Sequence, residues 1–271
     1  MNQVTGTLVR IGWRSFSGTV APYAVGSAAY VFVLLWLYPS VAHAPGIQSL
    51  LRTLPKGLVS ATGLSAGLAH PLPYLASEFY GTLYLWILMM VTVLSGARLL
   101  AEGPTRGAAG PYLAGPLTRR QWFLSQGAVV LSGLWLIAVV VSVAVPAGMA
   151  VFEPRTSLSL ARLLAINGMA FLLTATLAGI MALAAAGFAD DQQALSVGGA
   201  VIGAEYVLSV VSGLAPHLSW LRYLSLFSLY RPTALVTHGP LPVRAVLALC
   251  GLTLVSWGIA SELFRRRDLN L

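Results

Sequence analysis

The sequence predicts an all-α integral membrane protein with six membrane-spanning helices. Hydrophobic residues make up 57% of the 271 residues, charged residues make up only 9%, and the mean hydropathy is +0.80. Soluble domains carry roughly 25% charged residues, because a water-exposed surface needs them. Apolar stretches of about 20 residues, the length that a helix needs to cross hydrocarbon, recur along the chain. We therefore expect residues 1–271 to form a single transmembrane domain.

The N-terminal part of the chain is expected to hold an interfacial helix and two spans. Residues 4–15 are short and amphipathic and include Arg10, which predicts a helix lying on the membrane surface. Residues 16–38 form the first predicted span. Residues 39–77 are a long connection interrupted by five prolines. Residues 78–101 form the second predicted span.

Three further apolar stretches predict the third, fourth and fifth spans, at residues 122–151, 160–188 and 195–214. The fifth stretch contains Gly199 and Gly203. This spacing of small residues lets two membrane helices approach each other closely.

The last part of the chain combines an interrupted segment with one more span. Residues 215–244 have apolar and aromatic residues at helical spacing, but arginines and prolines interrupt them, so we expect amphipathic or re-entrant helices. Residues 245–264 form the sixth predicted span. Six crossings place both termini on one side, where the basic residues include Arg10, Arg14, Arg119, Arg120 and Arg265–Arg267. The positive-inside rule predicts that this side is cytoplasmic and that the protein lies in the cell membrane.

The connection between the second and third spans carries Arg106, Arg119 and Arg120, and such a segment cannot lie in hydrocarbon. A P-loop ATPase needs a lysine within G-x-x-x-x-G-K-[ST]. The only lysine, Lys56, lies outside such a motif, so we expect no ATPase site in this chain. Energy from ATP would have to enter through this connection from a partner protein. The low charge content also argues against nucleic-acid binding.

Three sequence blocks occur in order along this layout. The first block includes Arg106, Gly107, Leu113, Ala114, Pro116, Thr118, Arg119 and Arg120. The second is Trp220–Ser225 with Phe227, and the third is Leu263–Leu269. Together with the six spans, these blocks resemble the permeases of ABC exporters of the second type (ABC-2).

The resemblance implies a cytoplasmic coupling helix between the second and third spans and extracellular helices before the sixth. It also implies a dimer with a second permease, identical or homologous, and two copies of an ATP-binding subunit, which would bind ATP and magnesium. No cofactor is expected on this chain. The implied coupling residues are Arg106, Gly107, Leu113, Pro116, Thr118, Arg119 and Arg120. Gly110, Pro111 and Gln126 replace the family's glutamate, leucine and lysine, which makes the coupling helix shorter or places it later.

Glu205 lies within the fifth predicted span, where an ionised carboxylate costs about 2.5–3.5 kcal/mol. Either it faces a substrate path together with the adjacent Tyr206, or it is protonated or hydrogen-bonded to a neighbouring helix. Candidate partners on the fourth span are Asn167, Thr174 and Thr176. The apolar span faces favour a hydrophobic or amphipathic substrate, such as a drug, an antibiotic or a lipid-like molecule. The sequence does not distinguish among these substrates, nor a homodimer from a heterodimer.

Two other functions remain open. Gly63–Gly67 matches the G-x-S-x-G pattern, which would make Ser65 the nucleophile of a membrane-embedded hydrolase, but no strand–turn–helix pattern surrounds it. A membrane anchor or regulator without transport is the second alternative. The histidines are scattered, so the sequence predicts no metal site.

Overall fold

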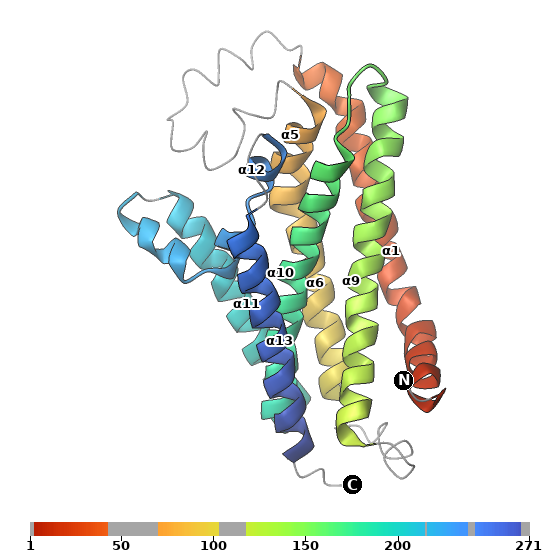
Figure 1. The fold of residues 1–271 in the computed structure, drawn as a ribbon, viewed down its shortest axis with the longest axis vertical. Helices are drawn as coiled ribbons and strands as arrows, with labels where there is room; N and C mark the ends of the chain where they lie inside the picture. Colours follow the sequence, from red (N-terminus) through yellow and green to blue (C-terminus); the bar gives the residue numbers. More distant parts are fainter. Residues whose placement is uncertain (1–2, 43–69, 103–117, 215, 238–241, 267–271) are drawn as a thin grey trace.

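The computed structural model describes residues 3–42, 70–102, 118–214, 216–237 and 242–266, and every regular element within these ranges is helical. Six of the described helical stretches are long and apolar enough to cross a membrane (Figure 1), which indicates a multi-pass membrane protein. They lie in α1 (Gln3–Ala42), in the consecutive segments α5 (Pro71–Leu75), η1 (Ala76–Leu83), α6 (Tyr84–Gly96) and η2 (Ala97–Glu102), and in α9 (Arg119–Phe152), α10 (Leu160–Gly187), α11 (Asp191–Leu214) and α13 (Val243–Arg266).

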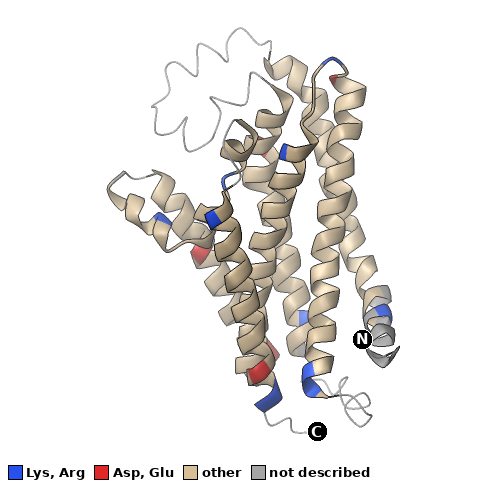
Figure 2. Cartoon of the chain, in the orientation of Figure 1, with Lys and Arg blue, Asp and Glu red and all other residues tan. Residues whose placement is uncertain are grey.

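The ends of these helices fall into two groups. The start of α1, the start of α9, the turn between α10 and α11, and the end of α13 lie at one end of the molecule (Figure 1). The end of α1, the start of α5 and the turn between α9 and α10 lie at the opposite end. Most described charged residues lie toward these two ends rather than in the middle (Figure 2). The predicted placement of both termini on one side therefore agrees with the helix order.

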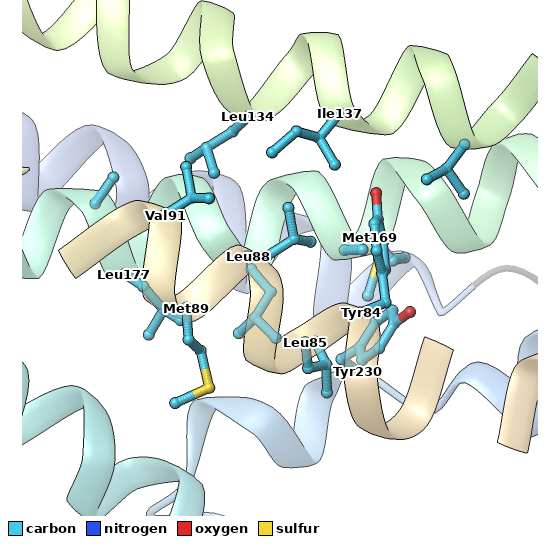
Figure 3. Packing of buried hydrophobic residues seen from close by; sticks show 14 of the residues in the cluster. Tyr84, Leu85, Leu88, Met89, Val91, Leu134, Ile137, Met169, Leu177 and Tyr230 are labelled. Carbon is cyan, nitrogen blue, oxygen red and sulfur yellow. The ribbon is translucent and has the colours of Figure 1, made fainter. Parts of the chain in front are cut away.

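Helix α10 is the centre of the bundle. Within its most apolar window, 78% of the residues are buried, compared with 17% in α11 and 28% in α13. Figure 3 shows side chains of α6, α9 and α10 packed together, among them Leu88, Leu134 and Leu177. Helix α11 is therefore attached at the periphery, and many of its side chains are exposed.

Trp257 of α13 holds α13 against both α9 and α10. Its ring lies so close to Gly127 of α9 that a Cβ at Gly127 would overlap it. Its indole N–H donates a hydrogen bond of 3.3 Å to the backbone carbonyl of Ala175 in α10. Gly179 of α10 lies directly against Ser256 and Trp257. Small residues that allow such close approach are typical of helix contacts in membranes.

The predicted interfacial helix at residues 4–15 is not a separate element, although the apolar span within α1 begins at Phe16, as predicted. Helix α1 runs without a break from Gln3 to Ala42, and its 40 residues would extend for about 60 Å, twice the thickness of the hydrocarbon core. The N-terminal turns stay helical because they continue along α9, where Gly12 lies against Val129. The prediction that the span ends before Pro39 is also wrong, since Pro39 lies within the helix.

The second span begins at Pro71, seven residues earlier than predicted. The prolines there do not break the helix, because Pro71 and Pro73 lie in the first turn, where backbone N–H groups need no helical acceptor. His70 is the N-cap, and its Nδ1 accepts a hydrogen bond of 3.2 Å from the Leu72 N–H. The possible surface helix at residues 47–58 lies outside the described residues.

The third and fifth spans also begin earlier than predicted, at Arg119 and Asp191. Thr118 and Gln121 form a capping box, in which each side chain accepts a hydrogen bond from the backbone N–H of the other, at 3.2 Å and 3.1 Å. Such a cap lets a helix begin in polar sequence before the apolar run starts. The fourth and sixth spans lie within two residues of the predicted bounds.

The segment before α13 forms three short helices, as expected of an interrupted amphipathic region. They are η3 (Pro216–Tyr223), η4 (Leu226–Leu229) and α12 (Pro232–Thr237). None is long enough to cross hydrocarbon, which needs about 20 residues. The helices η3 and η4 lie against α11, whereas α12 lies against α5, η1 and α10 (Figure 1).

We predict that Gly179→Ala destabilises the protein. The new Cβ would overlap Ser256 Oγ and lie 2.9 Å from Ser256 Cβ and 3.3 Å from Trp257 Cδ1, so α10 and α13 would have to separate. Overpacking of this kind costs about 1–3 kcal/mol. The measurement is the midpoint of thermal unfolding of the purified protein in detergent.

The matched control is Gly168→Ala on the same helix, because a Cβ at Gly168 meets nothing within 4 Å. We expect its unfolding midpoint to be unchanged or slightly higher, since alanine favours helix over glycine by up to about 1 kcal/mol. Equal midpoints for wild type and Gly179→Ala would contradict the close contact between α10 and α13.

Candidate functional site

Three of the predicted coupling residues lie in the described part of the chain, at the start of α9. Thr118 is its N-cap, and Arg119 and Arg120 occupy its first turn, where Arg120 is exposed and Arg119 is partly buried. These arginines are therefore part of a helix that continues into the bundle. The other predicted coupling residues lie outside the described residues; they are Arg106, Gly107, Leu113 and Pro116.

The start of α9 is packed firmly against the end of α13. The rings of Trp122 and Phe123 stack on Phe264, with centroid distances of 5.8 Å and 4.7 Å, and all three side chains are buried. Two residues before Phe264, Glu262 pairs with Arg265 and Arg266 at 2.6 Å and 2.7 Å. These exposed ion pairs lie within α13 and do not reach α9, whereas the stacked aromatic rings join the two helix ends.

An apolar groove runs between α6 and α11. Its volume is ≈ 470 Å³. Gly199 and Gly203, the small residues noted in the sequence, leave it open: a Cβ at Gly203 would meet nothing within 4 Å, and one at Gly199 would meet only Val93, at 3.6 Å. The remaining lining residues are Leu83, Trp86, Ile87, Met89, Met90, Leu94 and Ile202. A surface of this composition suits an apolar molecule or an apolar helix.

Tyr206, one of the two predicted substrate-path residues, lies beside this groove. Its hydroxyl accepts a hydrogen bond of 3.0 Å from the indole N–H of Trp86, and the two rings meet edge to face at 5.2 Å. Its ring also meets the ring of Phe227 in η4 edge to face, with a centroid distance of 5.5 Å. Tyr206 therefore joins α11 both to α6 and to η4.

Glu205, the other predicted path residue, is bonded to η4 and is not among the residues that line the groove. Its carboxylate Oε2 accepts a hydrogen bond of 2.8 Å from the Leu226 N–H. Its backbone carbonyl accepts a second bond of 2.8 Å from the Ser225 hydroxyl. The hydrogen bond to Leu226 gives the Glu205 carboxylate a structural partner, which agrees with the interpretation that it bonds to a neighbouring helix. A role of Glu205 toward a substrate stays a prediction.

The candidate partners of Glu205 on the fourth span were wrong. Asn167 donates to Tyr80, and Thr176 lies 2.8 Å from the Thr253 hydroxyl. Thr174 donates to carbonyls of its own helix. The side chains of Asn167, Thr174 and Thr176 already form hydrogen bonds within α10 or with η1 and α13, and none of these bonds is to Glu205.

Sequence analysis missed a buried polar cluster around Asn167. The Asn167 side chain donates 3.0 Å hydrogen bonds to the Tyr80 hydroxyl and to the Leu163 carbonyl, and it accepts a long contact of 3.5 Å from Tyr84. Tyr80 and Tyr84 are fully buried and are four residues apart on one helix face. That spacing, with an asparagine in the fourth span, is the signal that could have revealed the cluster. Tyr230 lies next to Tyr84 (Figure 3).

The candidate nucleophile of the hydrolase alternative, Ser65, is not among the described residues. Within the described residues, no group of three or more histidine, cysteine, aspartate or glutamate side chains could hold a metal ion. His70 is engaged as a helix cap, and His217 is exposed.

Comparison with protein-family models and with curated proteins gave no match to this chain. The family that the sequence blocks resemble therefore stays a prediction, and the function is inferred from the arrangement of the six spans.

We predict that Glu205→Ala destabilises the protein while Glu205→Gln has little effect. Alanine leaves the Leu226 N–H without its acceptor, and losing the partner of a partly buried donor costs about 1–3 kcal/mol. Glutamine keeps an acceptor oxygen at the same place. The measurement is the thermal unfolding midpoint in detergent. Equal destabilisation by both variants would show that the negative charge, rather than the acceptor atom, is what η4 requires.

Proposed function

We propose that this chain is the transmembrane subunit of an ATP-driven ABC exporter of the ABC-2 type. The observation that carries the proposal is the start of α9, where a basic, capped first turn leads directly into a helix that packs on the end of α13. The start of α1 and the end of α13 lie at that same end of the bundle (Figure 1). A soluble partner that binds this end could therefore act on several spans together.

In this proposal a separate ATP-binding subunit, present in two copies, supplies the energy. ATP and magnesium bind to that subunit, because the single lysine of this chain is not in a P-loop motif. Movement of the segment that includes Arg119 and Arg120 passes to α13 through Phe264. It passes on to α10 through Trp257, a residue of α13 that contacts both α9 and α10.

The substrate path is proposed to lie along the side of the bundle that bears the groove between α6 and α11. Helix α11 exposes apolar side chains such as Val207 and Val210, so lipid or protein must cover them. A second permease subunit, identical or homologous, would cover that face and complete the path. Because the groove is lined by aliphatic, methionine and tryptophan side chains, the substrate is proposed to be hydrophobic or amphipathic.

Charge reversal at Arg119 and Arg120 tests the coupling. We expect Arg119→Glu/Arg120→Glu to reduce the stimulation of the co-purified ATPase by about tenfold or more, because like charges placed at an interface cost several kcal/mol. The measurement is ATP hydrolysis by the reconstituted complex, with transport measured in the same vesicles.

The control is Arg10→Glu, which reverses an exposed charge near the same end of the bundle, on α1. It should leave stimulation close to wild type. Stimulation that survives in the Arg119→Glu/Arg120→Glu variant would reject the docking role. Purification of the active chain without any ATPase would reject the exporter itself.

Filling the groove tests the path. Gly203→Leu should reduce transport severalfold without loss of stability, because the added side chain enters open space and occupies the groove. Gly213→Leu is the matched control, since Gly213 also lies on α11 with nothing within 4 Å but does not line the groove. Equal transport by the two variants, measured as substrate uptake into inverted vesicles, would place the path elsewhere.

A further inference from the structure

A second hollow lies between the short helices η3 and η4 and the outer face of α13. Its volume is ≈ 510 Å³, and it combines two kinds of lining. Arg222 and Arg231 supply positive charge, while Leu224, Leu229 and Leu252 supply apolar surface. No part of the groove between α6 and α11 contributes to it, so it is a separate site.

Within the described part of the chain, neither Arg222 nor Arg231 forms an ion pair with a carboxylate. Arg222 donates to the Tyr223 hydroxyl at 3.0 Å, and Arg231 donates to the Ser228 carbonyl at 3.3 Å. These bonds use one N–H of each guanidinium, and each guanidinium has five. Several charged donors are therefore left to face the hollow.

The electrostatic environment of Tyr223 also reflects this excess of positive charge. The hydrogen bond from Arg222, the charge of Arg222 and the charge of Arg231 lower the pKa of the Tyr223 hydroxyl. Glu205 of α11 is the carboxylate that bonds to this segment, and its Oε2 accepts a hydrogen bond from the Leu226 N–H. An anion in the hollow would therefore meet two guanidinium groups.

The elements around the hollow are typical of a membrane edge. The helices η3 and η4 are too short to cross, and they lie beside α11 and α13 (Figure 1). Trp220 and Leu224 are exposed there, and Leu252 continues the apolar surface along α13. The positive-inside rule places most arginines on the side of the termini. Arginines on the opposite side therefore suggest a specific anionic partner.

We propose that this hollow binds an anionic phospholipid, with its phosphate held by Arg222 and Arg231 and an acyl chain lying along Leu252. Planar guanidinium groups bind phosphate oxygens through charge-assisted hydrogen bonds. The adjoining leucines distinguish a lipid from a free anion, because a soluble phosphate would leave them exposed. The proposal does not depend on ATP-driven transport, since it concerns a lipid of the leaflet at the end opposite the termini.

The test measures phosphatidylglycerol bound to the purified full-length chain in detergent, by native mass spectrometry during titration. We expect Arg222→Gln and Arg231→Gln to weaken binding about tenfold each, the change expected for loss of a charge-assisted contact. Arg155→Gln is the matched control. Arg155 is an exposed arginine in the turn between α9 and α10, and it does not line the hollow. Both Arg222 and Arg231 are exposed, so the variants should fold, which thermal unfolding would verify.

Two competitors distinguish the source of the phosphate. Phosphatidylcholine and soluble glycerol phosphate, at the same concentration, should not displace phosphatidylglycerol. Displacement by glycerol phosphate would show a simple anion site, and equal binding of phosphatidylcholine would show a nonspecific apolar surface. Either result would overturn the proposal, as would wild-type affinity in the Arg222→Gln/Arg231→Gln variant.

Discussion

Polar groups that enter hydrocarbon must find partners inside the protein, and this constraint governs where the few polar side chains of this chain lie. Asn167 bonds to Tyr80 and to its own helix, and Thr174 bonds to carbonyls one turn back. Glu205 is paired with a backbone N–H of η4. Since no water competes for these groups in lipid, the bonds from Asn167 to Tyr80 and from Leu226 to Glu205 also fix one helical element against another. The polar residues thus determine which elements are tied together.

Close packing determines the rest, because helices in lipid gain little from hiding apolar side chains from each other. The contacts of Trp257 with Gly127 and Gly179 bring α9, α10 and α13 to the shortest separation that side chains allow. Helix α10 is consequently buried on most sides, whereas α11 is not. The bundle therefore consists of a tightly packed group and one peripheral helix.

The six spans could be predicted from run length and hydropathy, but several of their ends could not. Hydropathy does not detect helix caps, so it placed the start of the second span after Pro71. Prolines such as Pro71 fit in the first turn of a helix and do not mark a break there. The Thr118-x-x-Gln121 spacing was a readable signal for the start of α9. The partner of Glu205 had no such signal, because a backbone N–H such as that of Leu226 is present in every residue and only the tertiary fold selects it.

The same bonds limit how α11 could move in an exporter that exposes its path alternately to the two sides. Glu205 and Tyr206 both contact η4, through the Leu226 N–H and the ring of Phe227. A movement that separated α11 from η4 would leave a carboxylate and a backbone N–H unpaired, which is costly at low dielectric. Helix α11 and η4 must therefore move as one body. The hydrogen bond from Trp86 to Tyr206 then becomes the polar contact that has to break or tilt when the groove beside α6 changes width.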